Sequence, residues 1–215
     1  DPIADGPILQ AAAQRALDSG TTLRGILRMV RELRNEGCEL PIALFSYANP
    51  LYSLGWKAAA RASKEAGVDG WLVPDMVPGQ ATAMLAAAQA HDLACVFFAA
   101  PTSSAQRIQA AANASRGFLY AIGRVGVTGG ATELTSNTLD FLRTLRENCS
   151  LPIGVGFGLR NAEQIAAVTE YAELAIVGSA FVERLRKVYD QHNSPSLVAA
   201  EAATYLNELQ QGLRS

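Results

Sequence analysis

The chain has 215 residues, of which 49% are hydrophobic and 18% are charged, a composition typical of a well-packed globular domain. We therefore expect residues 1–215 to form a single domain. The net charge of -2 provides no basic field for a phosphodiester backbone, so we expect no nucleic acid partner. We see no basic and apolar leader pattern and no apolar run of bilayer length, so we expect no membrane segment.

The cysteines and histidines do not form a metal-binding or disulfide pattern. Cys38, Cys95 and Cys149 are odd in number, widely spaced and without nearby histidines. This pattern is typical of buried free thiols in a reducing compartment, so we predict a cytoplasmic protein. His91 and His192 lack the spacing of metal ligands or of a catalytic triad, and we expect both at the surface. We predict no metal site.

Helical and strand patterns alternate along the chain. The chain begins with a helix that starts at Gly6-Pro7, followed by a helix in which apolar residues recur at helical spacing from Leu23 to Leu33. The predicted strands are residues 41–47, 70–73, 94–99, 117–122, 152–155 and 174–177. The later predicted helices are residues 55–66, 79–89, a segment opened by Ser103 and Ser104, 138–146, a segment capped by Asn161, 180–189, and one that Ser194-Pro195 begins as N-cap and N1.

Strands separated by single helices predict a parallel sheet, because each return to a parallel neighbour needs a crossover. A doubly wound sheet would need a GxGxxG loop after an early strand, and none follows one here. An eight-stranded barrel usually needs about 250 residues. We therefore predict an α/β fold, a (β/α)8 TIM barrel that lacks its first one to two βα units. The two helices before the first predicted strand would then follow a strand upstream of Asp1.

Small residues follow the last two predicted strands. Gly156, Phe157 and Gly158 come after the penultimate strand, and Gly178 and Ser179 come after the last. In TIM barrels these loops commonly bind phosphate, because small residues let backbone amides approach an anion beside a helix N-terminus. The pattern predicts a phosphate site, although glycines also serve ordinary turns.

A longer glycine-rich segment, residues 124–130, follows the strand at 117–122. It is consistent with a mobile lid, in which Gly129 would close over the phosphate, or with an exposed connection. Arg107, Arg124 and Arg160 also lie near strand ends, but we expect each to be a solvated surface residue.

Seven motifs follow one another along the chain. They are DPIADGP (1–7), SYANP (46–50), VPDM (73–76), APTS (100–103), GRVGVTGG (123–130), GVGFG (154–158) and VGSAFV (177–182). In this order and spacing they resemble the tryptophan synthase alpha subunit family. The resemblance implies a lyase of tryptophan biosynthesis that cleaves indole-3-glycerol phosphate to indole and glyceraldehyde 3-phosphate. It also implies an alpha-beta-beta-alpha complex, in which the indole passes to a beta subunit that uses PLP, and no cofactor in this chain.

The resemblance assigns roles to individual residues. Asp5 matches the family's catalytic aspartate, which hydrogen-bonds the indole N–H. Tyr47, Tyr120, Thr128 and Gly129 match positions that line the substrate pocket. Without the resemblance, Asp5 would be a turn residue before a helix, and the two tyrosines would be core or rim residues.

The partner surface predicted from the resemblance consists of strand-end loops. Its expected residues are Asp1, Pro2, Asn49, Pro50 and Asp75.

The chain also departs from the family pattern. The family's second carboxylate, a glutamate that donates and accepts protons, lies on strand two and is absent from these residues; Glu39 and Glu133 do not match its motif. Gly123 stands where the family has a small hydroxyl residue, and Val77 where it has a proline near the partner surface. We expect the 215-residue chain by itself to be nearly inactive.

Two other hypotheses remain. In the first, the chain is a catalytically silent alpha-like subunit that binds and activates a beta subunit. In the second, it is another sugar-phosphate barrel such as an isomerase of histidine synthesis. The combination of DPIADGP with GVTGG argues against the isomerase.

Overall fold

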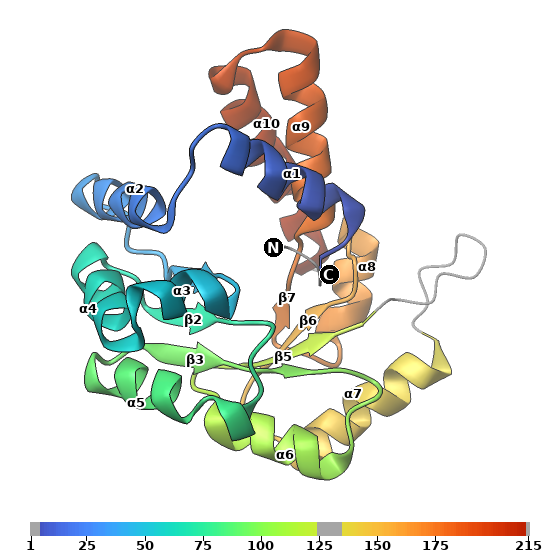
Figure 1. Ribbon diagram of the computed structural model, residues 1–215. Coiled ribbons are helices and arrows are strands. Elements are labelled where there is room, and N and C mark those ends of the chain that lie inside the picture. The colour runs from blue at the N-terminus through green and yellow to red at the C-terminus, as the bar shows by residue number, and fades with distance from the viewer. Residues whose placement is uncertain (1–4, 124–134, 214–215) are drawn as a thin grey trace.

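The computed structural model describes residues 5–123 and 135–213. Parallel strands form a curved sheet, and helices cover its outer, convex side (Figure 1). The strands are β1 (Ala43–Phe45), β2 (Gly70–Leu72), β3 (Ala94–Val96), β4 (Phe98–Ala99), β5 (Leu119–Ile122), β6 (Ile153–Gly156) and β7 (Leu174–Ala175). All of the predicted strands are present, and the predicted strand at 94–99 is divided into β3 and β4 at Phe97.

Strand order follows chain order, as expected for a barrel. β1, β2 and β3 pair in one ladder, and β4, β5, β6 and β7 pair in a second, every pair being parallel. Within the described residues no strand joins β1 to β7, so each pairs on one side only. The absence of the first one to two βα units stays a prediction.

The helices alternate with these strands. They are α1 (Pro7–Asp18), α2 (Leu23–Asn35), α3 (Ala48–Leu54), α4 (Trp56–Ala66), α5 (Thr82–Ala90), α6 (Ala105–Ala114), α7 (Ser136–Asn148), α8 (Ala162–Thr169), α9 (Ser179–His192) and α10 (Pro195–Gln210), with 3-10 turns at Pro78–Gln80 and Gln211–Leu213. None of these helices is long and apolar enough to cross a membrane.

Side chains cap several helices at their N-termini, where backbone amides lack helical partners. The N-cap residues whose side chains accept an amide hydrogen bond are Thr22, Ser104, Thr135 and Asn161. Ser194 also occupies an N-cap position, with Pro195 following it as predicted. The Ser194 side chain makes no capping hydrogen bond, and its hydroxyl lies 3.0 Å from that of Ser196.

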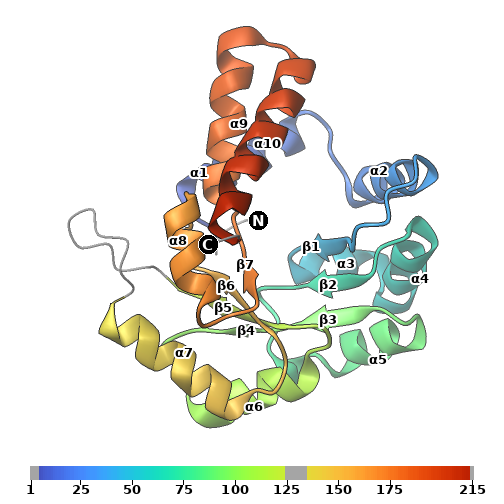
Figure 2. The same cartoon turned by 180° about the vertical axis from the view of Figure 1, so that it is seen from behind.

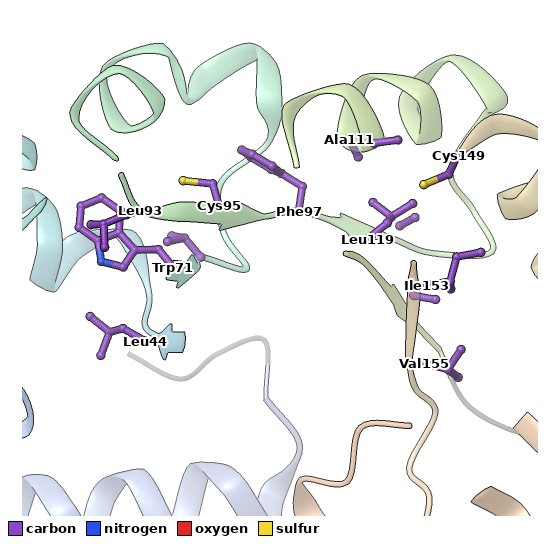
Figure 3. Close-up of a cluster of buried hydrophobic side chains, with 14 of the residues drawn as sticks. Leu44, Trp71, Leu93, Cys95, Phe97, Ala111, Leu119, Cys149, Ile153 and Val155 are labelled. Carbon is purple, nitrogen blue, oxygen red and sulfur yellow. The ribbon is translucent and has the colours of Figure 1, made fainter. Parts of the chain in front are cut away.

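The hydrophobic core fills the space between the strands and the outer helices. The buried side chains of Phe97, between β3 and β4, and of Leu119 in β5 lie on the side of the strands that carries α6, as the position of Ala111 shows (Figure 3). Trp71 of β2 is buried, and its indole nitrogen donates to Ser63 Oγ at 3.0 Å. Cys95 and Cys149 are also buried and Cys38 is half-buried, all three as free thiols.

In two places a carboxylate just before a strand accepts the same pair of hydrogen bonds, one from a helix and one from the neighbouring strand segment. Asp69, just before β2, accepts hydrogen bonds from the Ile42 amide at 2.8 Å and from Arg34 of α2 at 2.7 Å. Glu173, just before β7, accepts from the first amide of β6 at 2.8 Å and from Arg146 of α7 at 2.7 Å. Each carboxylate therefore links a helix, the strand after it and the next strand.

Candidate active site

Two predicted site residues, Asp5 and Tyr47, are in contact after the end of β1, and a third, Tyr120, lies within the electrostatic influence of Asp5. Asp5 precedes α1, Tyr47 follows β1 as the N-cap of α3, and Tyr120 lies in β5. The Tyr47 hydroxyl donates to Asp5 Oδ2 at 3.1 Å, which fixes the carboxylate beside the sheet. Burial raises the pKa of Tyr120, and the negative charge of Asp5 raises it further, so Tyr120 is a neutral hydroxyl near that charge.

Aromatic rings from neighbouring strands form a row next to Tyr120. The Phe98 ring lies 4.9 Å from that of Tyr120, and the Phe45 ring lies 6.1 Å from that of Phe98, measured between centroids. These residues alternate along their strands with the buried Phe97 and Leu119, so they project from the concave side of the sheet. Phe45 is 54% exposed, so an apolar, flat surface is open to a ligand.

A pocket of about 320 Å³ opens beside Asp5 and Tyr47. Apolar residues of α1, α2 and β1, among them Leu17, Ile26 and Phe45, form most of its wall. Small-molecule sites are typically apolar clefts of about 300 to 1,000 Å³ with a few well-placed polar groups. The pocket fits that description for a small ligand, with Asp5 as its charged group.

Glycines allow the aromatic side chains to lie against the strands. A Cβ on Gly156 of β6 would stand only 2.5 Å from Tyr120 Oη, so the tyrosine ring depends on a glycine there. A Cβ on Gly123 would stand 3.0 Å from the Phe157 ring. Gly123 therefore lies close to the buried Phe157 ring, which leaves little room for the small hydroxyl side chain that the family pattern has at this position.

The two glycine loops lie at the same edge of the sheet. β6 and β7 are neighbours, and the Ile176 amide donates to the Val155 carbonyl at 2.8 Å just before both loops begin. Gly158 has a φ of +76°, which favours glycine, and Gly178 is the N-cap of the 14-residue helix α9. The first amides of α9, which lack helical partners, therefore lie at the end of the loop that follows β7.

The predicted partner residues Asn49, Pro50 and Asp75 belong to two segments that a hydrogen bond joins, helix α3 and the loop after β2. Asp75, after β2, accepts a hydrogen bond from the Ala48 amide at 2.9 Å and so holds the start of α3, which carries Asn49 and Pro50. Tyr52 and Val77 are 67% and 55% exposed.

Several predicted residues lie outside the described part of the chain. These are Asp1, Pro2, Arg124, Thr128, Gly129 and Glu133. Arg160 is described: it is exposed and pairs with Glu183 of α9 at 2.9 Å. Arg107 is also exposed, as expected.

Comparisons with known proteins agree with these motifs and this fold. The family model described as tryptophan synthase alpha chain matches residues 1–214. The tryptophan synthase alpha chain of Alkalilimnicola ehrlichii is 41% identical over 213 residues, which cover 99% of this chain and 77% of the relative. That of Opitutus terrae is 40% identical over 214 residues, which cover 100% and 79%.

Solved structures with the same fold include tryptophan synthase subunit alpha from Legionella pneumophila, with a TM-score of 0.85 and 29% identity over 100% of this chain and 78% of that one. A chain of the tryptophan synthase a2b2 complex from Pyrococcus furiosus has a TM-score of 0.86 and 29% identity over 100% of this chain and 83% of that one. With a family model matched along 214 residues and relatives at about 40% identity, this chain belongs to the tryptophan synthase alpha chain family.

Proposed function

We propose that this protein is the lyase of the tryptophan synthase alpha family, which cleaves indole-3-glycerol phosphate to indole and glyceraldehyde 3-phosphate in tryptophan biosynthesis. Family membership supports the reaction class. The single structural observation that carries the proposal is the Asp5 carboxylate, held at 3.1 Å by Tyr47 beside an apolar pocket. An indole ring needs both features, an apolar surface for its face and an acceptor for its N–H.

The reaction is a retro-aldol cleavage, and it sets the task of each group. Protonation of the indole ring at C3 places positive charge at the ring nitrogen, and a base removes the proton of the neighbouring glycerol hydroxyl. Asp5 accepts the indole N–H and stabilises the positive charge, while Tyr47 orients the carboxylate. The rings of Phe45, Phe98 and Tyr120 supply an apolar face for the indole.

We assign the substrate's phosphate to the two glycine loops at the ends of β6 and β7. Gly156, Phe157, Gly158, Gly178 and Ser179 would surround it, with backbone amides as donors. Support comes from the shared edge of the two loops and from the start of α9 at Ser179.

Replacing Gly178 by leucine should weaken the binding of sn-glycerol 3-phosphate by about 10- to 100-fold, because a bulky side chain keeps the anion from charge-assisted bonds to the amides. A Cβ at Gly178 meets no atom within 4 Å, so the first atom of the new side chain enters open space. Titration calorimetry measures the effect. Gly79→Leu is the matched control, because its Cβ also meets open space, far from these loops in the sequence. Equal affinity of Gly178→Leu and wild type for sn-glycerol 3-phosphate would contradict the assignment of phosphate to these loops.

The partner that we propose is a tryptophan synthase beta subunit, which holds PLP and receives the indole, in an alpha-beta-beta-alpha complex. The similar chain from Pyrococcus furiosus is part of a tryptophan synthase a2b2 complex, which supports this pairing. The exposed surface of α3 with Tyr52, Val77 and the Asp75 loop is where we place the contact.

Asp75→Ala should weaken the complex with a cognate beta subunit about fivefold, because it removes the acceptor that holds the first amide of α3, a capping effect of about 1 kcal/mol. Analytical ultracentrifugation of mixtures provides the affinity. Asp140→Ala, an exposed aspartate on α7, serves as the control. If wild type forms no complex at all, the proposed pairing is wrong.

A further inference from the structure

Tyr205 contacts both segments that carry the glycine loops, although it lies on the outer helix α10. Its hydroxyl donates to the Arg160 carbonyl at 2.7 Å, two residues beyond Gly158. Its ring stacks on that of Phe181, with centroids 6.0 Å apart and planes inclined by 18°, and Phe181 is in the first turn of α9, two residues beyond Ser179. Figure 2 shows α10 beside both α8 and α9.

Charged neighbours fix the orientation of the Tyr205 ring, which is only 4% exposed. The Arg184 guanidinium lies 4.4 Å from the centre of the ring. Arg184 also forms ion pairs with Glu201 and Glu208, which stand four residues before and three residues after Tyr205 on the same face of α10. The tyrosine is therefore held between the two loop segments by contacts on several sides.

We infer that Tyr205 is a positioning residue for phosphate binding, which holds the loop after β6 and the start of α9 at a fixed separation. The inference rests on the proposed function, because it takes these loops as the phosphate site. Backbone donors bind an anion only when donors from both loops point to the same place at the same time. The Tyr205 hydroxyl restrains the first loop and its ring restrains the second, so one side chain sets their relative position.

Tyr205→Phe tests this role, because it keeps the ring contact with Phe181 and removes only the bond to the Arg160 carbonyl. We expect the dissociation constant for sn-glycerol 3-phosphate to rise about fivefold, which corresponds to about 1 kcal/mol, the typical value of one hydrogen bond. The dissociation constant for indole should stay within about twofold, because indole binds the aromatic pocket and not the glycine loops. Calorimetry supplies both constants, at a temperature at which thermal melts show each variant folded.

Tyr189→Phe is the matched control, since it removes a hydroxyl from α9 at a position that is 42% exposed. Unchanged affinity of Tyr205→Phe for sn-glycerol 3-phosphate would overturn the role of Tyr205 but would leave the proposed phosphate site in place. An equal loss of affinity for indole and for glycerol phosphate would also overturn it, because it would indicate general loosening of the fold. Failure of the wild-type chain to bind glycerol phosphate would overturn the proposed phosphate site together with the inference.

Discussion

Replacing Asp5 by alanine, in a version of the protein extended to carry both catalytic carboxylates, should lower kcat on the order of 10² to 10³, about 3 to 4 kcal/mol. The reason is that positive charge at the indole nitrogen develops during the reaction, so Asp5 stabilises the transition state more than the bound substrate. KM should change much less than kcat. The rate of indole release, measured over a range of indole-3-glycerol phosphate concentrations, separates the two constants.

Asp5→Asn separates charge from geometry. The asparagine keeps an acceptor for the indole N–H and for the Tyr47 hydroxyl but loses the negative charge. We expect its kcat to resemble that of Asp5→Ala more than that of wild type. Asp18→Ala, which removes an exposed carboxylate at the end of α1, is the control and should keep wild-type kcat. Near-normal kcat in both Asp5 variants would make Asp5 a turn residue and would leave the charge at the indole nitrogen to be stabilised by another group.

The 215-residue chain by itself should release indole at least about 100-fold more slowly than a version extended at the N-terminus by two βα units that carry the family's glutamate. General acid–base catalysis typically contributes about 10² to 10⁴ in rate, and the family resemblance implies a second proton-transfer group, a glutamate, that we expect to be absent from these 215 residues. Within the described residues, β1 and β7 also pair on one side only, so the sheet is open at that place.

A further variant separates these two causes. The extended protein with its added glutamate replaced by glutamine closes the sheet but lacks the second carboxylate, so it should remain nearly as slow as the 215-residue chain. Equal rates for the 215-residue chain and the extended protein would contradict the requirement for a second group. A fast glutamine variant would show that sheet closure, and not proton transfer, limits the rate.

Local signals were enough to predict most of the fold. The strands and the helices between them follow from hydrophobic periodicity, and the caps at Ser104 and Asn161 follow from residue type at a helix start. Helix α3 was missed because its sequence, ANPLYSL, has no side-chain cap of its own and contains a proline. The acceptor for its first amide is Asp75, which lies in the turn after the next strand and which no local pattern connects to α3.

The site was predictable only in part. Asp5, Tyr47 and Tyr120 were selected by the family resemblance, and the Tyr47–Asp5 hydrogen bond and the raised Tyr120 pKa place them together. Phe45 and Phe98 were missed, although alternation with buried neighbours marks them as facing the concave side. The contact of Tyr205 with Arg160 had no signal in the sequence, because it depends on how α10 packs against α8 and α9.

The measurement that most directly tests the proposed lyase function is the stoichiometry of the products formed from indole-3-glycerol phosphate by the extended protein. Indole is quantified by chromatography and glyceraldehyde 3-phosphate by a coupled dehydrogenase assay, with and without a cognate beta subunit. We expect indole and glyceraldehyde 3-phosphate in equal amounts when the beta subunit is absent, and tryptophan in place of indole when it and serine are present. Formation of a complex with the beta subunit without any release of glyceraldehyde 3-phosphate would contradict the lyase and would identify a silent subunit.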